Sequence, residues 1–86
     1  MGNVESLILE YIKRRLETGN LLVPRTEIMD ALGKSHPELL HRRAFMHGLD
    51  RLHRRHVINC IDAPDGVRHY FIGDFASAEM QQSLGL

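Results

Sequence analysis

Apolar residues recur every three or four positions over residues 4 to 18, the spacing that lines one face of an α-helix. These positions are Val4, Leu7, Ile8, Tyr11, Ile12 and Leu16. Gly19 follows the last of them, and glycine is the residue that most often ends a helix. The pattern therefore predicts a first helix over residues 4 to 18.

The next stretch predicts a short extended segment and then a short helix. Residues 21–23 are apolar but are followed by Pro24, which cannot donate to a central strand, so an edge strand or an extended connector is expected. Thr26 is a candidate N-cap for the helix, and Gly33 is expected to end it. Its apolar residues, again three and four positions apart, are Ile28, Ala31 and Leu32. A helix of about two turns must be held by packing, because isolated short helices are marginal in water.

The strongest helical pattern runs from Arg42 towards Ile58. Phe45, Leu49 and Leu52 form its apolar stripe, with Gly48 on the same side. The opposite side carries Arg43, His47, Asp50, Arg51 and Arg54. We therefore predict an amphipathic helix with a strongly basic outer face.

The start of this helix has two possible positions. Ser35 and Glu38 form a capping-box pattern, and Pro37 suits a first helical turn, so the helix could begin as early as His36. Leu39 and Leu40 fall off the apolar stripe if the helix is continuous, which requires either a break near His41 or a broad buried face. The sequence leaves both alternatives open.

Beyond Arg55 the pattern changes to that of strands. Residues 57–61 and 67–72 are rich in β-branched and aromatic residues, and the Pro64-Asp65-Gly66 turn signal lies between them, which predicts a β-hairpin. Asp74 is then a candidate N-cap for a last short helix over residues 75–84. This tail could pack on the first helix or mediate dimerisation.

Charge is distributed unevenly along the chain. Eleven Lys and Arg balance eleven Asp and Glu, which argues against a binder of nucleic acid that acts through net charge alone. Residues 41–56 nevertheless hold five Arg and four His against one Asp. A charged helix face is often only a solvated face, so this concentration needs support from the surrounding elements.

Length and composition limit the number of domains, the compartment and the kinds of site that the sequence can form. The 86 residues allow one domain, no run of about 18 apolar residues predicts a membrane helix, and the simplest expected compartment is the cytoplasm. The lone Cys60 permits no intramolecular disulfide. His53, His56, Cys60 and His69 have spacings that a zinc site could use, but no CxxC pair accompanies them, so no metal site is predicted. We expect neither catalysis nor a cofactor, since no nucleophile, base and orienting acid form a recognisable arrangement.

The order of helix, short strand, short helix, basic helix and hairpin resembles the winged helix-turn-helix domains of bacterial transcriptional regulators. The resemblance covers residues 4–72 and rests on VPRTEIMDALG at residues 23–33 and on Leu49-x-x-Leu52 leading through His56 into the hairpin. It implies a mostly α fold with a small antiparallel hairpin (α+β): a three-helix core, a wing and a short C-terminal helix. The corresponding units are residues 1–74 and 75–86.

In such domains the third helix lies in the major groove of double-stranded DNA, and the wing touches the DNA backbone or the minor groove. The resemblance implies groove contacts from Arg42, Arg43, His47 and Arg51, and a phosphate contact from Arg54. Thr26 and Ser35, at expected helix N-termini, are candidate phosphate contacts, and Arg68 is a positive residue of the wing. We therefore expect a regulatory protein that binds double-stranded DNA as a homodimer, with no membrane or small-molecule partner. The alternative is a protein-interaction module whose basic helix meets an acidic partner.

Overall fold

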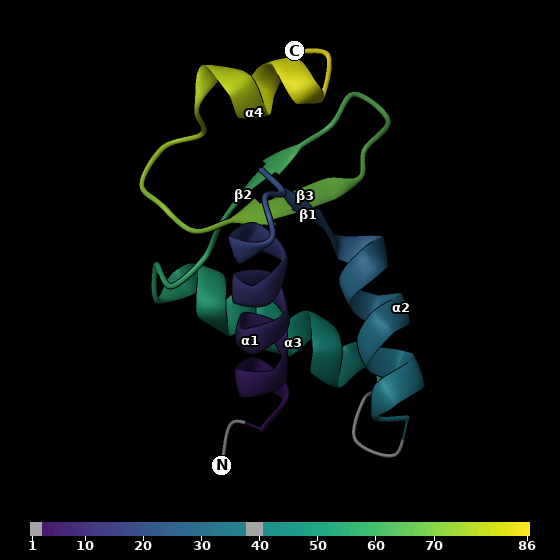
Figure 1. Ribbon diagram of the computed structural model, residues 1–86. Coiled ribbons are helices and arrows are strands. Elements are labelled where there is room, and N and C mark those ends of the chain that lie inside the picture. The colour runs from purple at the N-terminus through teal and green to yellow at the C-terminus, as the bar shows by residue number, and fades with distance from the viewer. Residues whose placement is uncertain (1–2, 38–40) are drawn as a thin grey trace.

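The computed structural model describes residues 3–37 and 41–86, which form four helices and a small three-stranded antiparallel sheet. In chain order the elements are α1 (Asn3–Glu17), β1 (Val23–Pro24), α2 (Arg25–Ser35), α3 (Arg42–Arg54), β2 (Asn59–Asp62), β3 (Arg68–Phe71) and α4 (Ala78–Ser83). Figure 1 shows α1, α2 and α3 on one side of the sheet and α4 on the other side. The predicted α+β class, with its helices and hairpin, is confirmed.

The sheet has the strand order β1-β3-β2, so the last strand of the chain lies between the other two. β2 and β3 form the predicted hairpin, in which Cys60 lies opposite Tyr70. β1 adds only two residues, with Val23 opposite Tyr70 on the other edge. The expected edge strand before α2 is therefore present.

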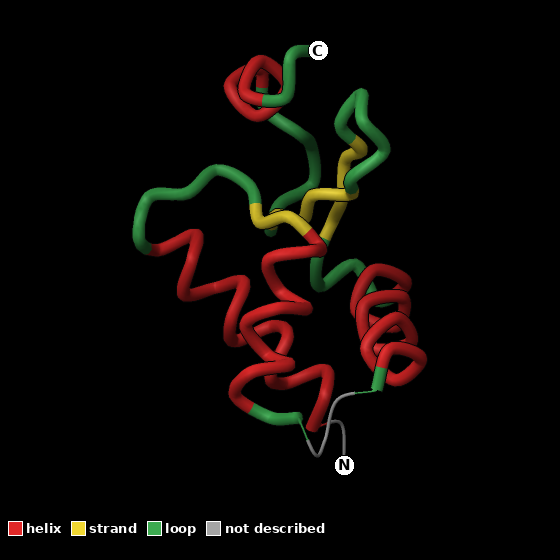
Figure 2. The backbone as a smooth tube through the Cα atoms, turned by 90° about the vertical axis from the view of Figure 1, so that its right-hand side faces the viewer, coloured by secondary structure: helices red, strands yellow, loops and turns green. Residues whose placement is uncertain are grey.

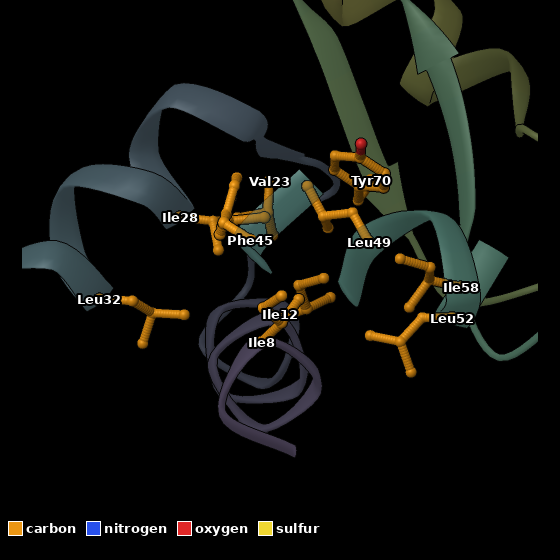
Figure 3. Packing of buried hydrophobic residues seen from close by; sticks show 10 residues of the cluster. All are labelled: Ile8, Ile12, Val23, Ile28, Leu32, Phe45, Leu49, Leu52, Ile58 and Tyr70. Carbon is orange, nitrogen blue, oxygen red and sulfur yellow. The ribbon is translucent and has the colours of Figure 1, made fainter. Parts of the chain in front are cut away.

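The main core lies between the three helices and the inner face of the sheet (Figure 3). Its fully buried side chains include Ile8 and Ile12 of α1, Ile28 of α2 and Phe45 of α3. Tyr70 of β3 closes the core on the sheet side, with 3% of its surface exposed. The apolar stripes predicted for the first three helices therefore all face this one core.

The outer face of the sheet buries one further side chain. Phe71 is 1% exposed but is not part of the main core cluster. It follows Tyr70 in β3, and successive strand residues point to opposite faces, so Phe71 faces the side on which α4 lies (Figure 1). The tail therefore lies on the outer side of the sheet rather than against α1.

The termini of α2 and α4 differ from the prediction. α2 runs through Gly33 to Ser35, and its N-cap is Pro24, so Thr26 lies within the first turn and does not cap the helix. The expected end of the helix at Gly33 is therefore wrong, since the helix continues for two more residues. α4 begins at Ala78, where the Ser77 side chain accepts a hydrogen bond from the Met80 backbone N–H, so the expected cap at Asp74 is wrong.

The basic helix begins at Arg42, with His41 as its N-cap. This places the break near His41 and excludes a start at His36, which instead is the C-cap of α2. Ser35 is the last residue of α2, and its hydroxyl donates to the Ala31 carbonyl oxygen at 3.0 Å, so the proposed capping box at Ser35 is wrong. The predictions for residues 38–40 lie outside the described residues.

α3 ends in a Schellman motif centred on His56. The His56 backbone N–H donates to the His53 carbonyl oxygen and that of Val57 donates to the Leu52 carbonyl oxygen, both at 3.0 Å. His56 has a φ of 61°, in the left-handed region. The chain therefore turns directly from α3 into the hairpin (Figure 2).

Candidate nucleic-acid interface

α3 has one face fixed against α1 and one face open to solvent. Phe45, Gly48, Leu49 and Leu52 are buried. At Gly48 an added Cβ would lie 3.0 Å from Ile8 Cδ1, so the absence of a side chain there lets the two helices approach closely. The predicted inward face of the basic helix is confirmed.

The opposite face carries what we call the outer stripe of α3: Arg43, His47, Asp50 and Arg54. All four are exposed and are spaced by four, three and four residues, so they follow one side of the helix. Arg42 is also exposed, at the first turn. Within the described residues, neither Arg42, Arg43 nor Arg54 forms an ion pair.

Arg51, a predicted groove residue, turns instead towards α1. Its Nη1 lies 3.4 Å from Glu5 Oε2, and Arg55 Nη1 lies 3.3 Å from Glu5 Oε1. The Glu5 side chain is only 12% exposed, so one carboxylate that is mostly shielded from water faces two guanidinium groups. Arg51 and Arg55 therefore link α3 to α1 as well as adding positive charge beside the outer stripe.

The two predicted phosphate contacts outside α3 and the wing, Thr26 and Ser35, lie at opposite ends of α2. Thr26 is exposed in the first turn of α2, where backbone N–H groups lack helical partners. Ser35 lies at the C-terminal end of α2, so the expectation that it lies at a helix N-terminus is wrong.

The wing cation Arg68 is engaged by the hairpin itself. Its Nε donates to Asp62 Oδ1 at 2.8 Å and its Nη2 donates to Asp62 Oδ2 at 3.3 Å. This bidentate hydrogen bonding lowers the pKa of Asp62 and raises the pKa of Arg68. The wing thus presents a paired cation rather than a free one, and its tip residue Asp65 is exposed.

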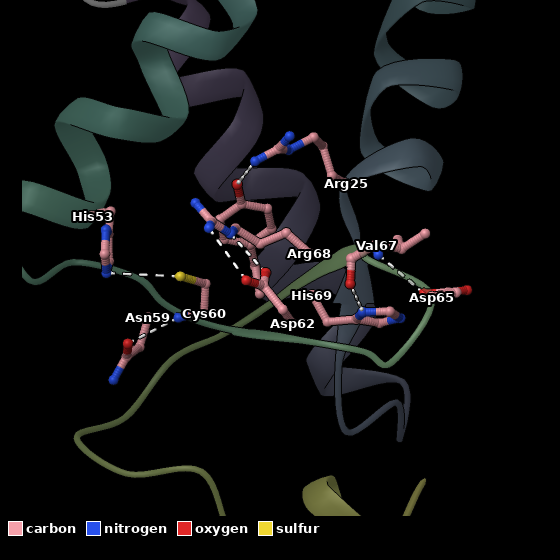
Figure 4. A network of polar contacts seen from close by, with 10 residues as sticks. Arg25, His53, Asn59, Cys60, Asp62, Asp65, Val67, Arg68 and His69 are labelled. Atoms are coloured by element: carbon pink, nitrogen blue, oxygen red, sulfur yellow. Dashed lines mark hydrogen bonds and ion pairs between the residues drawn. The ribbon is translucent and has the colours of Figure 1, made fainter. Parts of the chain in front are cut away.

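Arg25 is a cation that the sequence pattern did not single out. It is the first residue of α2, and its Nη2 donates to the Tyr70 hydroxyl at 3.5 Å, a long contact (Figure 4). Its Nε is buried and has no hydrogen-bond partner among the described residues. Burial raises the pKa of the Tyr70 hydroxyl, which keeps this group a neutral partner. Only its position beside Pro24 at the start of a helix could have indicated Arg25.

Figure 4 also places His53 of α3 beside Cys60 of β2, with 3.8 Å between His53 Nε2 and Cys60 Sγ. Burial raises the pKa of the Cys60 thiol. Across residues 3–37 and 41–86, no three His, Cys, Asp or Glu side chains gather in a way that could hold a metal ion. The two residues form a contact between α3 and the hairpin.

Comparison of the chain with protein-family models, with curated proteins and with solved structures found no match. Among the helices of the described part, none has both the length and the apolar composition needed to cross a membrane.

Proposed function

We propose that this chain is a winged helix-turn-helix domain that binds double-stranded DNA by placing the outer stripe of α3 in the major groove. The fold-level support is the element order: three helices, a short strand between the first two, and a hairpin directly after the third helix. This is the order on which the resemblance to winged helix-turn-helix domains rests. The hairpin then corresponds to the wing.

One observation carries the DNA-binding proposal: the exposed cations of α3 that no acid within the described chain neutralises. Arg43 and Arg54 lie at the two ends of the outer stripe, about 16 Å apart along the axis at 1.5 Å per residue. That span is comparable to the width of the major groove, about 12 Å. A guanidinium group can reach a guanine edge or a phosphate from either end.

The test is fluorescence anisotropy with a random-sequence duplex across a salt series, for the wild-type protein and an Arg43→Ala, Arg54→Ala double variant. If both side chains neutralise phosphates, the slope of log K against log salt should shrink by about 1.8, since each phosphate contributes about 0.9. Arg14→Ala is the matched control, because Arg14 is an exposed arginine of α1 that pairs with Glu10. No binding by the folded wild-type protein at low salt would contradict the proposal.

Arg43→Ala alone separates base reading from phosphate binding. A base contact should cost about 1–3 kcal/mol on the specific site and relax specificity at one position. A phosphate contact should weaken binding to all duplexes equally.

A second candidate function is a protein-interaction module in which α3 meets an acidic partner. The wing favours it, because Asp62 neutralises Arg68 and the exposed Asp65 would be repelled by phosphate. Binding to such a partner should show a shallower salt dependence and no competition from random duplex.

A further inference from the structure

The flank of α1 that faces away from α2 leaves apolar side chains partly uncovered. Leu9 and Leu16 are half-buried on this flank, and Lys13 lies between them, one turn from each. Two shallow hollows open along it. The first, of about 490 Å³, includes Leu9 and Val57, and the second, of about 460 Å³, includes Leu16 and Ile72.

The chain after β3 extends this apolar surface. Ile72, the residue that follows β3, is 42% exposed, and Phe75, three residues later, is 86% exposed. Single exposed apolar residues are ordinary on a protein surface, but Ile72 lines the same hollow as Leu16, on the flank that also shows Leu9 and Val57. We call the set formed by Leu9, Lys13, Leu16, Glu17, Val57 and Ile72 the apolar strip.

The charges within the apolar strip indicate what covers it. Lys13 and Glu17 are both exposed and line the same hollow as Leu16 and Ile72. Within the described residues neither forms an ion pair, whereas the neighbouring Arg14 on α1 pairs with Glu10. A lysine and a glutamate four residues apart on one helix match the same pair on an antiparallel copy of that helix.

We propose that the apolar strip is a two-fold interface with a second copy of this chain. In an isologous contact the same surface meets itself, so Lys13 of each copy faces Glu17 of the other. The two Leu16 and Ile72 pairs then lie between these reciprocal ion pairs. The proposal does not rest on DNA binding, because the apolar strip lies on α1 and on the segments that follow α3 and β3, whereas the outer stripe lies on the solvent face of α3.

Sedimentation equilibrium on the full chain tests this interface by charge reversal. Wild-type protein should reach twice the mass of one chain as its concentration rises. Lys13→Glu or Glu17→Lys places like charges across the interface and should raise the dimer dissociation constant about tenfold or more. The double swap Lys13→Glu, Glu17→Lys restores opposite charges and should recover most of the wild-type affinity.

Arg14→Glu is the matched control, since Arg14 is an exposed residue of α1 outside the apolar strip, and it should leave dimerisation unchanged. Circular dichroism of each variant checks that α1 remains folded. Ile72→Asp should give a folded monomer. A wild-type protein that stays monomeric at every concentration, or single reversals that leave the dimer intact, would overturn the proposed interface.

Discussion

His56 occupies a backbone position that suits glycine better than histidine. Its φ of 61° places it in the left-handed region, where the Cβ of an L-residue crowds its own backbone. The conformation is held by the two Schellman hydrogen bonds and by the burial of Leu52 and Ile58 on either side. The surrounding structure thus imposes a locally unfavourable conformation on one exposed side chain.

Replacing His56 with Gly should therefore stabilise the protein by about 1 kcal/mol, because glycine adopts this conformation without the Cβ clash. Urea denaturation followed by circular dichroism measures the change. The matched control is His47→Gly, an exposed histidine with helical backbone, where the same substitution should lower the free energy of unfolding. A loss of stability in His56→Gly would show that the imidazole itself makes a stabilising contact.

At the scale of elements, two helical glycines have opposite roles. Gly33 lies in α2, where an added Cβ would meet no atom of the described residues within 4 Å. Gly48 lies in α3 where an added Cβ would be 3.0 Å from Ile8 Cδ1 and 3.3 Å from Val4 Cγ1. Gly33 therefore lowers the stability of α2 without allowing any closer packing. Gly48, in contrast, allows α1 and α3 to approach closely.

Gly33→Ala should raise the free energy of unfolding by about 0.5–1 kcal/mol, the usual gain for alanine over glycine inside a helix. Gly48→Val should lower it by about 1–3 kcal/mol, because a well-packed contact cannot accept the larger side chain without moving Ile8. The two variants serve as controls for each other in the same denaturation experiment. Equal effects would mean that the α1–α3 contact adapts to a larger residue.

The elements were predictable where local pattern and tertiary packing agree. The apolar pattern over residues 4–18 predicted α1 to within one residue at each end. The Pro64-Asp65-Gly66 turn signal predicted the hairpin. The Ser35–Glu38 pattern misled because the Ser35 hydroxyl bonds back to Ala31 within α2 rather than forward. Asp74 is a good N-cap residue and therefore predicted a helix from Phe75, but Ser77 supplies the cap that starts α4.

The candidate site was predictable only in part. The apolar stripe of α3 identified its outward side, so the exposure of Arg43, His47 and Arg54 followed from periodicity. The pairing of Arg51 with Glu5 was not predictable, because it joins residues far apart in the sequence through the packing of two helices. The buried Nε of Arg25 was missed for the same reason, since β3 comes to lie beside α2 only in the folded chain.

At the scale of the whole molecule, the tail is attached to the sheet by one side chain in particular. Asn59 of β2 donates from Nδ2 to the carbonyl oxygens of Gly73 and Asp74, at 3.4 and 3.1 Å. Its Oδ1 accepts a hydrogen bond from the Cys60 backbone N–H at 2.8 Å. The amide therefore joins the hairpin to the segment that leads into α4.

Asn59→Asp keeps the acceptor for Cys60 but removes both donors. Amide hydrogen exchange in residues 75–86 should then quicken about fivefold, the equivalent of a hydrogen bond worth about 1 kcal/mol, while exchange in α1 stays unchanged. Asn20→Asp is the matched control, because Asn20 Nδ2 donates to the Arg15 carbonyl oxygen at the end of α1 instead. Unchanged exchange in the tail would show that Phe71 and α4 hold it without Asn59.

The placement of charge has a consequence for how the molecule moves in an electric field. The chain has no formal net charge, yet the cations of α3 that form no ion pair with any described residue lie on the helical side of the sheet, while Asp74 and Glu79 belong to the segment that crosses to its other side (Figure 1). Such a molecule is a permanent dipole: near neutral pH it has little electrophoretic drift but experiences a torque. It should approach a polyanion with α3 foremost, already oriented before contact.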